Sequence, residues 1–268
     1  MIKLIAIDVD GTLLDSNRKL PKENIMAIRE INKEKRKIVI STGRPYSGIE
    51  SILKKLDLIR NNQYCITNTG AFVMENKSKK SIILNTLDIK DYNYLESLIK
   101  GYNLQLSIYT SNEIYNYSDR PNNASLHDSR ILKMKIKTPD KNFKSPIGRI
   151  NVMGDKEEID KFQNKYLKLL SENYYLMRNE TFSLEILNKN CGKGKALKKL
   201  WEFLGIKMSE VIAIGDNEND IEMLSFAGTG IAMGNANSKV KKNADFITKS
   251  NDDCGVAFLI KNINNFYK

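Results

Sequence analysis

The sequence feature that most constrains this chain is a short apolar run ending in two carboxylates, within LIAIDVDGTLLD at residues 4–15. Its first four residues are apolar and rich in β-branched side chains, which predicts a buried strand. Asp8 and Asp10 follow directly. Because side chains alternate along an extended chain, these two lie on one face, about 6.5 Å apart. Neighbouring carboxylates repel each other and lose hydration on burial, so we expect a cation between them.

Apolar strands and helices alternate in the N-terminal third of the chain and again after Lys193. The N-terminal elements are expected at 3–8 (strand), 22–34 (helix), 37–42 (strand), 46–56 (helix) and 64–73 (strand and turn). The C-terminal elements are expected at 194–204 (helix), 211–215 (strand), from about 219 (helix), and in the strands TGIAMGN and DFITK. This order is typical of βαβ units and predicts a parallel sheet.

Between about Ser81 and Leu187 the pattern changes to alternating strands around two amphipathic helices. The segments of alternating hydrophobicity are LQLSIYT, EIYNYS, ILKMKIK and FSLEIL. In the second helix, four residues recur at helical spacing and are expected in the core: Ile159, Phe162, Tyr166 and Leu169. We therefore predict an α/β domain, formed by residues 1–83 and 188–268, that is interrupted by an inserted α+β domain at residues 84–187.

The composition argues against nucleic-acid and membrane partners. The 43 basic and 32 acidic residues give a net charge of +11, but the lysines are scattered over the predicted helices rather than gathered in one stripe. No apolar run approaches the roughly 18 residues of a membrane span, and Met1 leads straight into the first strand, which leaves no room for a targeting segment. Three widely spaced cysteines suit a reducing compartment. We therefore expect a cytoplasmic protein.

Polar residues follow several of the predicted strands, at the edge of a parallel sheet where ligands bind. These residues are Asp8 and Asp10, then Thr42, Gly43 and Arg44, then Asp216, Asn219 and Asp220, with Lys193 in CGKGKAL entering the later helix. The carboxylates of Asp8, Asp10 and Asp216 are expected to form an oxygen-rich site that suits Mg²⁺ rather than zinc. A hydroxyl, a glycine N–H and a lysine ammonium form a cradle for a phosphate. Together they predict a phosphoryl-transfer site.

Four segments in this order resemble the motifs of the haloacid dehalogenase (HAD) superfamily: DVDGTLLD, ISTGRP, GKGKAL and GDNENDIEML. The later segments GIAMGNA and NDDCGVAFLI resemble the Cof-type branch of that superfamily. The resemblance runs nearly end to end. It implies a Rossmann-like parallel-sheet core with a C2-type cap inserted between the second and third motifs. The core would then be residues 1–83 and 188–268, and the cap residues 84–187.

The resemblance also implies a role for each motif residue. Asp8 corresponds to the nucleophile that becomes a phosphoaspartate, and Asp10 to the general acid and base. The family's Mg²⁺ would be held by the side chains of Asp8 and Asp216 and by the backbone carbonyl of Asp10. The phosphate-binding positions correspond to Thr42, Gly43, Lys193 and Asn219. The positions that support these residues correspond to Asp220 and Arg44.

These observations favour a Mg²⁺-dependent phosphomonoester hydrolase acting on small phosphorylated metabolites, such as sugar phosphates or phosphorylated cofactors. A phosphomutase and a non-catalytic phosphate-binding regulatory protein remain alternatives, whereas Asp10 argues against a dehalogenase, which protonates no alkoxide. Two details stay open within the motifs. Lys195 competes with Lys193 for the phosphate-binding role, and Asn68-Thr69-Gly70-Ala71 departs from the family's Asn-Gly-Ala. The sequence leaves the physiological substrate and the oligomeric state undetermined.

Overall fold

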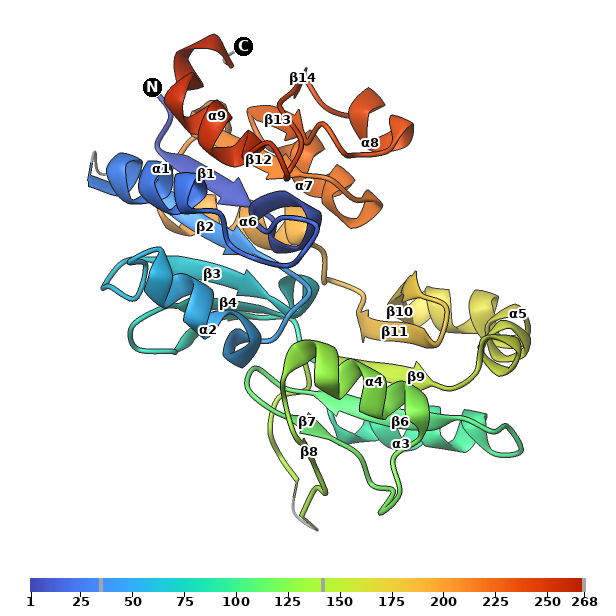
Figure 1. The fold of residues 1–268 in the computed structure, drawn as a ribbon. Coiled ribbons are helices and arrows are strands. Elements are labelled where there is room, and N and C mark those ends of the chain that lie inside the picture. Colours follow the sequence, from blue (N-terminus) through green and yellow to red (C-terminus); the bar gives the residue numbers. More distant parts are fainter. Residues whose placement is uncertain (34–35, 141–142, 267–268) are drawn as a thin grey trace. The chain divides into compact units, whose positions relative to one another are not determined.

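The structure is a computed structural model that describes residues 1–33, 36–140 and 143–266 (Figure 1). The chain divides into two compact units. We call the first the core unit, which comprises Met1–Gly43, Glu50–Ile83 and the segment from Gly192 onward. We call the second the inserted unit, which comprises Leu84–Cys191 together with the short segment Arg44–Ile49.

The core unit is built on an eight-stranded sheet with the order β14-β13-β12-β1-β2-β3-β4-β5. From β14 to β3 neighbouring strands pair in parallel, and β4 is antiparallel to β3. The central strand is β1, whose Ile7 pairs with Ile214 of β12 on one side and with Ile40 of β2 on the other. The strands are β1 (Leu4–Ile7), β2 (Lys37–Ser41), β3 (Tyr64–Thr67), β4 (Phe72–Glu75), β5 (Ser81–Leu84), β12 (Val211–Gly215), β13 (Thr229–Ala232) and β14 (Phe246–Ile247).

Helices cover both faces of this sheet because its strand residues are apolar on both sides. Leu4 and Ala6 share an apolar cluster with α6 and α7, whereas Ile5 and Ile7 point to the opposite face, where α1 and α9 lie (Figure 1). The helices are α1 (Lys22–Lys33), α2 (Tyr46–Lys55), α6 (Lys193–Phe203), α7 (Ile221–Phe226), α8 (Ser238–Lys242) and α9 (Gly255–Lys261). The predicted α/β class with a parallel-sheet core is confirmed.

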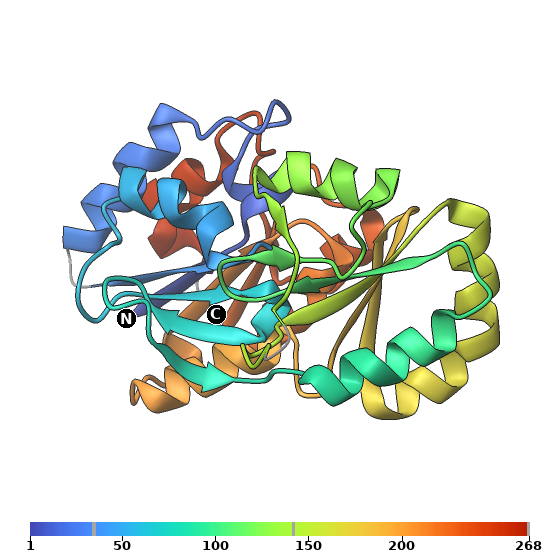
Figure 2. The same ribbon diagram turned by 90° about the horizontal axis from the view of Figure 1, so that it is seen from below.

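The inserted unit has a second sheet of six strands, with the order β10-β11-β9-β6-β7-β8. One of its faces packs an apolar core against α3 and α5, and α4 lies on the other side (Figure 2). The strands are β6 (Gln105–Tyr109), β7 (Ile114–Tyr115), β8 (Ile136–Lys137), β9 (Arg149–Met153), β10 (Tyr174–Glu180) and β11 (Ser183–Asn188), and the helices are α3 (Ile89–Ile99), α4 (Asn123–Leu132) and α5 (Lys156–Asn173).

The face of this sheet that meets α4 is polar although it is buried. The Ser107 hydroxyl lies 3.1 Å from the hydroxyl of Ser125 on α4, and the Tyr109 hydroxyl donates to Asp128 on the same helix. Beside them, Arg149 and Glu185 form an ion pair of 2.9 Å between β9 and β11. Hydrogen bonds therefore join helix α4 to this face of the sheet.

Two sequence predictions for this unit were wrong. ILKMKIK was expected to form a strand, but α4 extends to Leu132 and β8 contains only Ile136–Lys137, so this region has three helices in its described residues instead of two. Only Ser125 of α4 is fully buried, which left no apolar periodicity to detect. Leu169 was expected in the core but is 44% exposed, and its neighbour Leu170 is buried instead, because the helical repeat advances four residues from Tyr166.

Helix α1 ends at Lys33, and the expected end at residue 34 lies outside the described residues. Across the part of the chain that the structure describes, no helix combines the length and the hydropathy needed to cross a membrane.

Candidate active site

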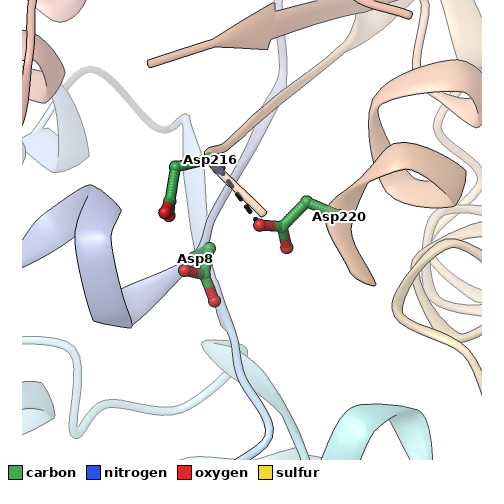
Figure 3. Close-up of side chains that lie close together, drawn as sticks. All are labelled: Asp8, Asp216 and Asp220. Atoms are coloured by element: carbon green, nitrogen blue, oxygen red, sulfur yellow. Dashed lines mark hydrogen bonds between the residues drawn. The ribbon is translucent and has the colours of Figure 1, made fainter. Parts of the chain in front are cut away.

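Three carboxylates converge at the carboxyl end of the central strands (Figure 3). Asp8 directly follows β1, and its N–H continues the ladder by donating to the carbonyl of Ile214 over 3.1 Å. Asp216 directly follows the paired strand β12, and Asp220 ends the short 3₁₀ turn η4 (Glu218–Asp220). One oxygen from each carboxylate lies within 4.8 Å of the other two. Parallel pairing of β1 with β12 thus brings together residues about 200 positions apart in the sequence.

The Lys193 ammonium lies between two of these carboxylates. Its Nζ is 2.6 Å from Oδ1 of Asp8 and 2.7 Å from Oδ1 of Asp220. Lys193 is the first residue of α6 and is only 2% exposed. Burial alone would lower the pKa of this ammonium, but the charges of Asp220 and Asp8 outweigh burial and raise the pKa above its ordinary value. Lys193 is therefore a fixed positive charge beside Asp8.

All the strong contacts of the Asp220 carboxylate hold other groups in place. Its Oδ1 accepts from Lys193, and its Oδ2 accepts from the backbone N–H groups of Asp216 and Asn217, each over 3.1 Å. Asp220 therefore orients the ammonium and also shapes the turn that carries Asp216. The predicted supporting role of Asp220 stays a prediction, but the contact with Lys193 that it requires is present.

Asp216 is oriented by a residue that the sequence reasoning missed. The Thr12 hydroxyl donates to Oδ1 of Asp216 over 2.6 Å. Thr12 lies in the turn that follows β1, η1 (Val9–Leu13), in which Asp10 and Gly11 have non-helical backbone angles. In the same turn Gly11 has a φ of +81°, and a Cβ at that position would lie 2.3 Å from Oδ2 of Asp216. The Asp-Gly-Thr run is thus shaped to receive the Asp216 carboxylate.

Asp10 lies on the same turn, and its side chain is exposed. Burial is the main reason that the pKa of Asp216 is raised, and the negative charge of Asp10 adds to it, so the two carboxylates are close enough to interact. An exposed carboxyl group that stands beside a buried one suits proton exchange with a substrate or with water. The role of Asp10 as general acid and base stays a prediction.

Two backbone hydrogen bonds link Thr42, a predicted phosphate-binding residue, to the start of α6 through Thr69. The Thr42 carbonyl accepts from the N–H of Thr69, and the Thr69 carbonyl accepts from the N–H of Gly192, both over 3.0 Å. Thr69 lies in η2 (Asn68–Gly70) with a φ of +54°, a left-handed conformation that costs a β-branched residue about 1–3 kcal/mol. Thr69, which belongs to the segment that departs from the family's Asn-Gly-Ala, therefore forms a strained link between the end of β2 and the residue before Lys193.

The other predicted residues differ in how the structure places them. Asn219 lies in η4, and its Oδ1 atom is buried without a hydrogen-bond partner among the described residues. Gly43 is half-buried just after Thr42. Arg44 begins the short segment that groups with the inserted unit, and its supporting role stays a prediction.

The donor set at this strand edge fits Mg²⁺. Asp8 and Asp216 contribute oxygen ligands only, and hard divalent cations of this size prefer oxygen. Both oxygens of Asp220 already accept hydrogen bonds, from Lys193 and from two amides. Among the described residues, Asp8 and Asp216 accept side-chain hydrogen bonds at Oδ1 only, which makes them the better ligands. Burial and then the charge of Asp220 raise the pKa of Asp8 well above its usual range, so the pocket favours a positive charge opposite it.

We expect the metal-free protein to lose stability as the pH rises from about 4 to about 6. Burial raises the pKa of Asp216 from 3.8 to about 6, against the opposing hydrogen bond from Thr12. A raised pKa in the folded state gives stability that is complete below the unfolded pKa and is lost as the pH rises through the folded one. The shift corresponds to about 2 kcal/mol after allowance for partial exposure. The pKa of Asp8 is also raised, so Asp8 likewise contributes stability that is lost as the pH rises.

Urea denaturation in EDTA at a series of pH values measures this slope. Asp216→Asn is the matched variant because it keeps the shape of the side chain and removes the titration. We expect a flatter pH profile for this variant, and a higher free energy of unfolding than the wild type near pH 7. Identical profiles for the two proteins would contradict the prediction.

We expect Lys193→Ala to lower kcat/KM about 10²-fold or more, because a positioned ammonium beside a transferring phosphoryl group contributes a few kcal/mol. The change also leaves the buried Asp8 and Asp220 carboxylates without their counter-charge, which destabilises the fold by about 3 kcal/mol. Lys195→Ala is the matched control, since Lys195 is a half-buried lysine two residues further along the same helix. Steady-state kinetics on both variants, with circular dichroism to verify folding, provides the comparison. Equal losses would show that the motif alignment is shifted.

Comparisons with known proteins agree on one family. The model of the haloacid dehalogenase-like hydrolases matches residues 5–260. The phosphatase YwpJ of Bacillus subtilis (strain 168) is 29% identical over 98% of this chain and 100% of its own length. From the same organism, the 5-amino-6-(5-phospho-D-ribitylamino)uracil phosphatase YcsE is 32% identical, over 97% of this chain and 95% of its own. A haloacid dehalogenase-like hydrolase from Bacteroides thetaiotaomicron superimposes with a TM-score of 0.90 at 29% identity, covering 98% of this chain and 100% of that one.

Proposed function

The chain belongs to the family of haloacid dehalogenase-like hydrolases and is a phosphatase of that family, and we propose that it hydrolyses small phosphorylated metabolites with Mg²⁺, through an aspartyl-phosphate intermediate. The observation that carries the proposal is the buried Asp8 carboxylate with the Lys193 ammonium 2.6 Å away and Asp216 on the adjacent strand end. A nucleophile, a fixed positive charge and an oxygen-only cation site are the parts that phosphoryl transfer needs. We also propose a cytoplasmic location, supported by three widely spaced cysteines that are not joined in disulfides.

In the first half-reaction, an oxygen of Asp8 attacks phosphorus while the ester P–O bond to the leaving group breaks. Asp10 donates a proton to the leaving alkoxide, which departs as an alcohol. In the second half-reaction, Asp10 takes a proton from water as the water oxygen attacks phosphorus, and the bond to Asp8 breaks. Inorganic phosphate leaves, and both carboxyl groups return to their starting states.

Lys193 serves both half-reactions as a fixed charge beside the phosphoryl oxygens, and Asp220 keeps its ammonium in place. Thr42, Gly43 and Asn219 are proposed to bind the same phosphoryl group. The cation would be held by Asp8 and Asp216, together with the backbone carbonyl of Asp10. When bound, Mg²⁺ supplies positive charge that offsets the repulsion between these carboxylates and a phosphate dianion.

A turnover assay on an aryl phosphate, with and without Mg²⁺, tests the catalytic class. We expect release of inorganic phosphate that depends on added Mg²⁺. A panel of phosphate esters then identifies the substrate class, and it includes 5-amino-6-(5-phospho-D-ribitylamino)uracil because a relative is named for it. Formation of a phosphate isomer without release of phosphate would indicate a mutase instead. A chain that binds phosphate esters but turns none over would indicate a regulatory protein.

We further propose that the inserted unit is the cap that selects among leaving groups, since the core unit contains the groups proposed for the phosphate and the metal. His127 and Arg120 are candidates, and His127 stacks edge-on against Phe182 at 5.2 Å. We expect His127→Ala and Arg120→Ala to change the ranking of larger esters severalfold while leaving acetyl phosphate hydrolysis nearly unchanged. The measurement is kcat/KM over the ester panel. A common factor for every substrate, acetyl phosphate included, would exclude selection by these residues.

A further inference from the structure

Helix α6 begins without a capping side chain of its own. The residue before it is Gly192, with φ 146° and ψ 137°, and it has no side chain to accept from the first N–H groups of the helix. A helix normally satisfies one or more of these N–H groups with a side-chain oxygen at that position. Because Lys193 is the first residue of α6, the order of this turn determines where its ammonium lies.

A carboxylate from another helix takes the place of the missing cap. Glu222 is the second residue of α7, and its Oε2 accepts from the backbone N–H of Lys195 over 3.3 Å. Lys195 is the third residue of α6, which is the position whose N–H an ordinary cap residue would bind. A negative charge at this end of the helix is also favourable toward the helix dipole.

The two glycines of GKGK are independent evidence that the Glu222 side chain packs against the first turn of α6. A Cβ on Gly192 would lie 2.3 Å from Oε2 of Glu222, and a Cβ on Gly194 would lie 2.7 Å from its Cγ and its backbone carbonyl. A Cβ on Gly194 would require a shift of one helix, because it would meet the Glu222 backbone, whereas a Cβ on Gly192 would displace the Glu222 carboxylate. The spacing of glycines around Lys193 therefore allows Glu222 to approach the helix closely.

The first turn of α6 is thus held from two sides. On one side the Gly192 N–H donates to the Thr69 carbonyl of η2, and on the other Glu222 binds the Lys195 N–H. Between these two contacts Lys193 extends to Asp8 and Asp220. We propose that Glu222 is a positioning residue, which keeps the Lys193 ammonium in place for phosphoryl transfer by capping α6 from α7. This inference rests on the proposed function for the reaction that Lys193 serves.

The test compares Glu222→Ala with the conservative variant Glu222→Gln, which keeps an acceptor oxygen at the same place. We expect Glu222→Ala to lower kcat about tenfold, with a smaller change in KM, and Glu222→Gln to stay within about threefold of the wild type. Glu202→Ala is the control, because Glu202 is exposed near the other end of the same helix. Amide hydrogen exchange of residues 193–196 supplies a readout that does not depend on activity.

We expect these amides to exchange faster in Glu222→Ala and nearly as in the wild type in Glu222→Gln. Unchanged exchange and unchanged kcat in Glu222→Ala would overturn the inference and leave the proposed function intact. Equal losses of kcat in both variants, with protected amides in both, would also overturn it, because the acceptor oxygen would then have no part in the effect. If the wild type hydrolysed no phosphate ester while Glu222→Ala still lost amide protection, the proposed function would fail and the capping contact would stand.

Discussion

Asp8→Asn is expected to lower kcat by about 10⁴-fold or more, with the protein still folded. The amide has nearly the shape of the carboxylate but cannot attack phosphorus, so no covalent intermediate can form at this position. Burial and the charge of Asp220 raise the pKa of Asp8, which means that the ionised form is disfavoured in the metal-free chain. Removing this charge relieves that cost and leaves Asp220 as the counter-charge of Lys193, so we expect the variant to stay folded. Thermal denaturation in EDTA would show a variant at least as stable as the wild type.

Asp10→Asn is the matched comparison at the next carboxyl group of the same turn. It should slow both half-reactions, because each needs a proton transfer, and it should have the smallest effect on aryl phosphates, whose leaving groups need little protonation. Trapping a phosphoenzyme analogue in the wild type and mapping it by mass spectrometry decides the assignment. We expect the label on Asp8, and a label on any other residue would overturn the mechanism.

Removal of the divalent cation is expected to lower turnover by about 10³-fold, and excess Mg²⁺ should restore it fully. A bound cation contributes several kcal/mol to charge stabilisation in a transition state. A cation is needed here because one oxygen of Asp8 lies within 4.8 Å of one oxygen of Asp216, and both carboxylates would face a phosphate dianion. Lys193 supplies one positive charge, but Asp220 shares it.

The measurement is the initial rate after exhaustive chelation and again after titration with Mg²⁺, at a pH near 7.5. Circular dichroism of the chelated protein verifies that it remains folded. Asp216→Asn is the informative variant, since it should require far more Mg²⁺ for any turnover. Full activity in the chelated wild type would exclude the metal from the reaction.

The sequence motifs were sufficient to predict the parts of the site that follow strands. Asp8 and Asp216 could be placed at one sheet edge because parallel strands end together, and the family resemblance selected Lys193. The contact between Thr12 and Asp216, by contrast, joins residues 204 positions apart, and no local pattern marks it. The role of Glu222 was missed for a related reason. Its signal was the pair of glycines around Lys193, which the sequence alone presents only as a motif.

In the inserted unit, helix α4 could not be predicted because its buried side is polar. Sequence periodicity detects helices that bury an apolar stripe, and α5 was found in that way through Phe162. Helix α4 instead contacts its sheet through Ser125 and Asp128, so the sequence of its buried side resembles that of a solvent-exposed helix face. A buried polar interface of this kind leaves no trace in a hydrophobic pattern.

The position of β1 in the core sheet has a consequence for how the chain is made. On the ribosome, β1 can pair with β2 soon after both emerge, but its other edge must wait for β12, which begins at Val211. Until then the nascent chain has an open edge on its most central strand, and Asp8 has neither Lys193 nor Asp216 beside it. Because domains fold as units during synthesis, residues 84–191 have time to fold before the core sheet closes. Catalytic competence is therefore acquired late in translation, when the last third of the chain returns to the first strand.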